Sequence, residues 1–102
     1  MPLLDGDGYL VDPRDWNESV ARELARREGL ELTPEHWHVL AFMRAWYDEH
    51  QVAADARFVI RELVARHGPD ARNTLFELFP YGYPGQACKI AGMRRPRAWS
   101  TG

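Results

Sequence analysis

The residue best suited to chemistry is Cys88, the only cysteine among the 102 residues. It lies in a Gly/Pro-rich C-terminal stretch, PYGYPGQACKIAGMRRPRAWSTG, outside the part with helical apolar spacing. Nearby cations and a helix N-terminus lower the pKa of a thiol and so produce the nucleophilic thiolate. Lys89 is adjacent, and a short helical turn is expected at residues 86–91. The sequence predicts a reactive thiol on a cationic arm, although a lone cysteine is as often a buried structural residue.

Charge is distributed unevenly along the chain. Residues 1–87 carry 9 basic and 15 acidic residues (net −6), whereas residues 88–102 carry 4 basic and no acidic residues (net +4). The acidic part argues against broad DNA binding, which relies on neutralising phosphates. The basic stretch suits an acidic partner surface or the protein's own body. Within it, Arg94, Arg95 and Trp99 are candidate partner-binding residues.

Length and composition favour a single small cytoplasmic domain. A chain of 102 residues has room for one core. A single cysteine excludes an intramolecular disulfide, which suits a reducing compartment. The first residues, MPLLDGDGYL, lack the features of a signal peptide. No apolar run approaches the roughly 18 residues of a membrane span, so we expect no membrane contact.

The elements that must position Cys88 are predicted to be mostly α-helical. Residues 3–11 fit a small β-hairpin with an Asp-Gly turn. Caps followed by proline and the spacing of apolar residues predict helices at residues 13–28, 34–50, 53–67 and 70–79. The last two, joined by a tight Gly-Pro turn, leave room for a helix-turn-helix-like core. We expect a helical body at residues 1–80 and an extended C-terminal arm at residues 81–102.

Other polar residues give weaker signals. His36 and His38 are two residues apart on a predicted helix and point to different faces, so no metal site is expected. Arg57 and Arg61 share one helical face, and they form either a solvated stripe or an anion site. No cofactor motif is present in the sequence.

Several segments together resemble the DsrC/TusE sulfur-relay family along almost the full chain: DGYLVDPRDW, LARREGLELTPEHW, RAWY, LFELFPYGYPGQ and QACKIAG. The resemblance implies a DsrC-like helical domain with a winged helix-turn-helix-like arrangement, an N-terminal hairpin and no cofactor. It also implies a cytoplasmic sulfur-trafficking protein whose arm carries a persulfidated cysteine into a partner. The implied partners are sulfurtransferases, sulfite-reductase-type proteins or heterodisulfide-reductase-like complexes.

The sequence departs from the family pattern at one cysteine. Full members carry a second arm cysteine eleven residues after the first, and Trp99 stands at that position here. One thiol cannot form the arm disulfide or trisulfide of two cysteines. The tRNA-thiolation branch keeps only the terminal cysteine, so this chain, which keeps the upstream one, resembles the regulatory members. Arg57 matches the family's arginine, and Arg61 stands where a lysine is usual, beside the arm.

Two functions from different classes remain open at this stage. In the first, Cys88 accepts or senses sulfur as a persulfide or mixed disulfide, with Lys89 and nearby arginines lowering its pKa. In the second, the chain is a non-catalytic regulatory module that binds a partner protein or, as the weaker option, DNA. A buried, purely structural Cys88 is the third interpretation. The intact motif around Cys88 places the carrier or sensor first by a small margin.

Overall fold

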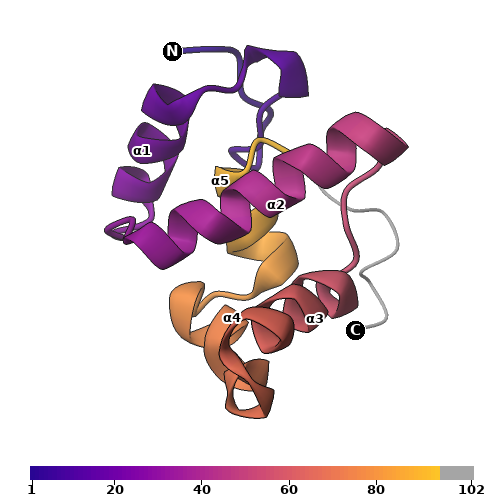
Figure 1. Cartoon of the computed structure of the whole chain (residues 1–102). Coiled ribbons are helices and arrows are strands. Elements are labelled where there is room, and N and C mark those ends of the chain that lie inside the picture. Colours follow the sequence, from indigo (N-terminus) through magenta and orange to yellow (C-terminus); the bar gives the residue numbers. More distant parts are fainter. Residues whose placement is uncertain (95–102) are drawn as a thin grey trace.

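The computed structural model describes residues 1–94, so the predictions for Arg95 and Trp99 lie outside the described residues. Helices and helical turns make up the regular structure of this part (Figure 1). Five α-helices are present: α1 (Glu18–Arg27), α2 (Pro34–His50), α3 (Ala56–His67), α4 (Thr74–Leu78) and α5 (Cys88–Ile90). Short turns complete them: the 3₁₀ turns η1 (Pro13–Asp15) and η2 (Pro69–Asn73), and the π-helical turn η3 (Tyr83–Ala87). The prediction of a mostly helical protein is confirmed.

Side-chain caps explain where the long helices begin. Asn17 accepts a hydrogen bond from the Val20 amide, and this cap starts α1 later than the Asp12-Pro13 pair predicted. The Asp12-Pro13 pair starts only η1. Thr33 and His36 form a reciprocal capping box at the start of α2, as the Thr-Pro signal predicted. These caps orient α1 and α2, the two helices that hold the C-terminal residues.

The predicted N-terminal β-hairpin is wrong for the described chain. Residues 1–94 contain no strand, and pairing is limited to one antiparallel bridge between Leu4 and Leu10. The carboxylate of Asp5 accepts hydrogen bonds from the amides of Asp7 (2.9 Å) and Tyr9 (3.0 Å). These side-chain bonds close the turn, and backbone bonds from the Asp5 amide to the Tyr9 carbonyl (2.8 Å) and from the Val11 amide to the Leu3 carbonyl (3.0 Å) flank the bridge, so the pairing is too short to form strands. The winged arrangement is also unsupported, because a wing requires paired strands.

The segment of residues 83–93, which follows α4, contributes several buried side chains to the core. Tyr83, Cys88, Ile90 and Met93 are each 2% exposed or less. Figure 1 shows this orange-to-yellow segment at the centre of the molecule, with α1, α2 and α3 around it. The expectation of an extended arm is therefore wrong for residues 83–93, because their apolar side chains complete the core. The division into a body and an arm beyond them stays a prediction.

In the described part of the chain, no helix combines the length and apolar character needed to cross a membrane.

Candidate functional site around Cys88

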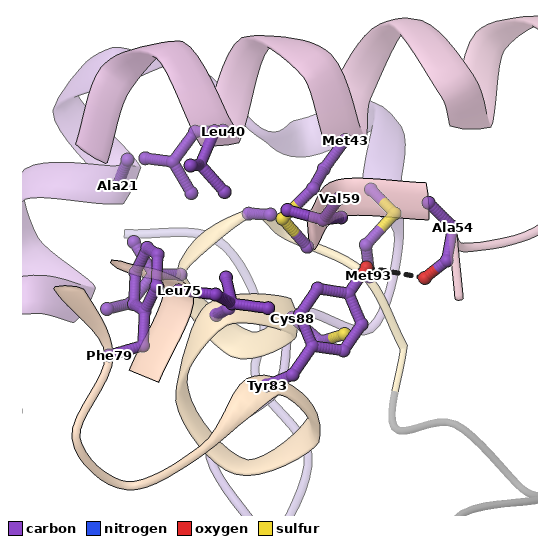
Figure 2. Close-up of a cluster of buried hydrophobic side chains, with 14 of the residues drawn as sticks. Ala21, Leu40, Met43, Ala54, Val59, Leu75, Phe79, Tyr83, Cys88 and Met93 are labelled. Atoms are coloured by element: carbon purple, nitrogen blue, oxygen red, sulfur yellow. Dashed lines mark hydrogen bonds between the residues drawn. The ribbon is translucent and has the colours of Figure 1, made fainter. Parts of the chain in front are cut away.

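Cys88 is the first residue of α5, directly after the π-helical turn η3. In the local sequence QACKIA, the small and apolar residues Ala87, Cys88, Ile90 and Ala91 are buried together with the polar Gln86, and the segment enters the core as a compact turn. The amide of Met93 donates to the carbonyl of Cys88 at 2.9 Å, which closes the chain after α5. The cysteine is 0% exposed. Figure 2 shows its sulfur beside the ring of Tyr83.

This environment keeps the thiol protonated. Burial raises the pKa of Cys88 to about 12, and a hydrogen bond with the Tyr83 side chain acts in the opposite direction with a smaller effect. Burial also raises the pKa of Tyr83, whose hydroxyl donates to the Ala54 carbonyl. Because the thiolate is the reactive form, the enclosed thiol is not a nucleophile near neutral pH. The expectation of a lowered pKa is wrong for this conformation.

Lys89 does not act on the sulfur. Its half-buried ammonium group lies 5.2 Å from the centroid of the Tyr9 ring and 3.7 Å from a carboxylate oxygen of Glu28. Burial and Tyr83 account for the shift of the Cys88 pKa, and Lys89 is not among its causes. The lysine instead joins α5 to the N-terminal loop and to the end of α1.

The remaining predicted site residues that the structure describes, Arg57, Arg61 and Arg94, lie on the surface away from Cys88. Arg57 and Arg61 are exposed on α3, and their guanidinium carbons lie 5.8 and 5.4 Å from the centroid of the Phe58 ring. Arg57 also pairs with Asp55 at 3.1 Å. Arg94, the last described residue, is exposed. The structure brings Arg57 and Arg61 together, and their roles beside the arm stay predictions.

Two residues that the sequence did not mark as functional hold the chain next to Cys88. The indole nitrogen of Trp16 donates to the Ile90 carbonyl at 2.9 Å, and Arg44 donates to the Ala91 carbonyl at 3.1 Å. In the sequence, Trp16 occurs only within the DGYLVDPRDW segment and Arg44 only within the RAWY segment. A single arginine inside the apolar run of residues 39–47 was the available signal for such a contact.

The histidines have structural partners. His36 is buried, and its Nε2 atom lies 2.7 Å from the Leu78 carbonyl, which joins α2 to α4. His38 lies 3.0 Å from a carboxylate oxygen of Glu62. Across the residues that the structure describes, no group of three His, Cys, Asp or Glu side chains is arranged to hold a metal ion.

The chain is a small helical domain whose cysteine lies in a C-terminal segment bounded by glycine and proline residues, and comparison with known proteins shows the family to which this combination belongs. The DsrC-like protein family matches residues 2–98, and the chain belongs to that family. Sulfurtransferase TusE of Sodalis glossinidius is 40% identical over 94 residues, which cover 90% of this chain and 87% of that protein. The TusE homolog of Haemophilus influenzae is 38% identical, with coverage of 90% and 86%.

Solved structures share the fold. The oxidized gamma-subunit of the dissimilatory sulfite reductase (DsrC) from Archaeoglobus fulgidus superposes with a TM-score of 0.86 at 33% identity, over 95% of this chain and 90% of that chain. The DsrC of Allochromatium vinosum superposes with a TM-score of 0.80 at 38% identity, over 93% and 87%. The helical arrangement around Cys88 is therefore the DsrC fold.

Proposed function

We propose that this protein docks on a partner in sulfur transfer and that Cys88 is a gated thiol, which accepts or senses sulfur only when it leaves the core. Membership of the DsrC-like family and the sulfurtransferase relatives support the sulfur-relay part. One observation carries the gating: the protein's only thiol is completely buried. A buried, protonated thiol has neither access nor nucleophilicity, so residues around it must move before it reacts.

The transfer step needs no external oxidant. The exposed Cys88 thiolate attacks the outer sulfur of a donor persulfide, R–S–SH. The donor S–S bond breaks, the donor leaves as R–S⁻, and a new S–S bond forms on Cys88. One sulfane sulfur moves from donor to acceptor, and the oxidation states balance. A second arm thiol is missing, so an intramolecular trisulfide is outside this chemistry.

A sulfurtransferase, a sulfite-reductase-type protein or a heterodisulfide-reductase-like complex is the proposed partner kind. The basic residues of the C-terminal stretch, with Arg57 and Arg61 on α3, are the proposed contacts for a partner or for an anionic sulfur species. The cytoplasmic location expected from the sequence stays part of the proposal. These assignments rest on the family and on the charge distribution.

The second candidate is a regulatory module that binds the same partner without sulfur chemistry. The burial of Cys88 and the rise of its pKa to about 12 favour it. In this function Cys88 is a core residue, and the partner contacts the surface alone. The two candidates differ in one measurable respect, which is whether Cys88 carries sulfur.

Incubation of the full chain with glutathione persulfide, followed by intact mass spectrometry, tests the proposal. We expect a species heavier by one sulfur atom, formed slowly in the free protein, faster with a sulfurtransferase present, and absent in Cys88→Ala. An unchanged mass, under conditions that load the Haemophilus TusE homolog, would favour the regulatory candidate.

A further inference from the structure

The turn that follows Cys88 is held by two side chains from distant parts of the sequence. Trp16, just before α1, donates from Nε1 to the Ile90 carbonyl at 2.9 Å. Arg44, on α2, donates from Nη1 to the Ala91 carbonyl at 3.1 Å. Carbonyls at the end of a helix lack intrahelical donors, and these two bonds supply them. The end of α5 is thus fixed by groups that belong to α2 and to the α1 entrance.

Arg44 links this turn to the N-terminal part of the molecule. Its Nη2 atom donates to the Pro13 carbonyl at 2.8 Å, and its guanidinium carbon lies 4.7 Å from the centroid of the Trp16 ring. Burial lowers its pKa, yet no carboxylate oxygen lies within 4 Å of it among residues 1–94. Its hydrogen bonds therefore go to backbone carbonyls, and a charged donor strengthens each of them.

At Gly92 the backbone of the cysteine turn lies very close to the Trp16 ring. Gly92 has φ +77°, a backbone conformation that favours glycine, and a Cβ at this position would lie 2.5 Å from Cδ1 of Trp16. The turn therefore lies directly against the indole, with no room for a side chain between them. This proximity lets Trp16 and Arg44 act on adjacent carbonyls of the same turn.

The same two side chains face an open groove of about 650 Å³ between α1 and α2. Its other lining residues are Glu18, Arg22, Trp37, Ala41, Ala45 and Asp48. Cys88 does not line this groove and is completely buried. The two side chains that hold the cysteine segment therefore line a groove that is open to solvent, although Ile90, Ala91 and the thiol are buried.

We propose that Trp16 and Arg44 are positioning residues that control the exposure of Cys88: breaking their bonds to Ile90 and Ala91 releases the cysteine turn while α1 to α4 stay folded. The proposal deepens the gated function and rests on it for its biological meaning. The physical claim concerns access to the thiol and needs no sulfur transfer. A hydrogen bond from a charged group is strong enough to change an equilibrium about tenfold or more.

Alkylation of Cys88 by iodoacetamide in the full chain tests this claim. Arg44→Gln removes the charge, and Trp16→Phe removes the indole donor while keeping an aromatic ring at this position. Both are expected to raise the alkylation rate at least about tenfold. Arg44→Lys keeps the charge but cannot reach two carbonyls as a planar fork, so an intermediate rate is expected. Arg22→Gln is the matched control, since Arg22 lines the same groove without bonding the cysteine turn, and its rate should equal that of the original protein.

Urea unfolding of each variant separates local release from general destabilisation. The rise in alkylation rate must exceed the rise in the global unfolding constant, and at low urea the rate must depend only weakly on urea. Equal rises, or original alkylation rates in both Arg44→Gln and Trp16→Phe, overturn the proposal. Faster alkylation without sulfur loading from glutathione persulfide leaves the positioning role standing and counts against the proposed function.

The pH profile gives a further readout that a structural role alone would not produce. If the thiol reacts only after release, the rate should rise about tenfold for each pH unit and should continue past the ordinary thiol pKa near 8.5, because the mostly buried thiol stays protonated while the released thiol ionises. Arg44→Gln should raise the whole profile without changing its shape. A profile that levels off near pH 8.5 would mean that the thiol is already exposed and titrates normally in the resting protein, and this result would overturn the proposal.

Discussion

Cys88 and Tyr83 are two titratable side chains that the fold buries next to each other, and burial disfavours the charged form of both. The chemistry of Cys88 is thus set by its conformation more than by the charges near it in the sequence. Four basic residues lie at positions 88–102, yet neither Lys89 nor Arg94, the two of them that the structure describes, is among the causes of the Cys88 pKa shift. The same residue is inert when enclosed and an ordinary thiol when released.

The raised pKa of Cys88 makes the stability of the protein depend on pH. Its pKa is about 12 in the folded protein and 9.0 without the fold, so the folded state binds the extra proton between these values. The part of the unfolding free energy that comes from the protonated, buried thiol is fully present below pH 9. It is lost as the pH rises toward 12, by at most about 1.4 kcal/mol for each pH unit. We expect urea unfolding to show a loss of stability that begins near pH 9.

Cys88→Ala is the control for this titration. Tyr83 also has a raised pKa and an ordinary value of 10.0, so it adds to the loss only at higher pH. Between pH 9 and 10 the difference in unfolding free energy between the original protein and Cys88→Ala therefore isolates the thiol. A difference that stays constant from pH 7 to 10 would show that the thiol titrates with its ordinary pKa in the folded protein.

At the scale of elements, the sequence predicts the helices well because their signals are local. The Thr33-Pro34 pair marks the start of α2, and the structure confirms it. The helical turn expected near residues 86–91 exists as η3 and α5. The N-terminal hairpin was wrong because pairing stops at one bridge between Leu4 and Leu10, although the turn between them forms and is capped by the Asp5 carboxylate.

The burial of Cys88 could not be predicted from the sequence in the same way. It involves contacts between residues that are far apart in the sequence. Trp16 contacts Ile90, 74 positions away, and Arg44 contacts Ala91, 47 positions away. Glycine and proline content indicates an irregular segment, but it does not say whether that segment extends into solvent or folds inward. The apolar pattern of Cys88, Ile90 and Met93 was the available signal for an inward segment.

Gly92→Ala tests how tightly the cysteine turn is held. Positive φ costs an alanine about 1–2 kcal/mol, and the 2.5 Å approach to the Trp16 ring adds about 1–3 kcal/mol, because a half-buried indole cannot move aside freely. We expect a total loss of about 2–5 kcal/mol in urea unfolding. Gly29→Ala is the matched control: Gly29 has φ +69° and no atom within 4 Å of its added Cβ, so only the backbone cost applies. Equal losses in the two variants would mean that the turn does not press on Trp16.

At the scale of the whole molecule, the charge distribution restricts the kind of partner. Residues 1–87 have a net charge of −6, and the 4 basic residues at positions 88–102 are the only excess of positive charge. Several exposed arginines of the helices are already paired with carboxylates, as Arg26 and Arg27 are with Glu23. A phosphate backbone would meet repulsion over most of the surface, whereas an acidic protein surface needs to meet only the C-terminal stretch.

This distribution predicts that the protein does not bind DNA non-specifically. Fluorescence anisotropy with a labelled random-sequence duplex should show no binding at about 0.15 M salt, because binding of this kind requires many phosphates to be neutralised at once. Any weak binding at low salt should disappear in the triple variant Arg94→Ala, Arg95→Ala, Arg97→Ala, which removes the positive stretch but leaves Cys88 and Lys89. Binding at about 0.15 M salt in the range typical of non-specific DNA-binding proteins, about 10⁻⁴–10⁻⁶ M, would contradict the prediction. It would also favour a regulatory module that acts on DNA over a protein partner, because the acidic body would then have to be turned away from the duplex.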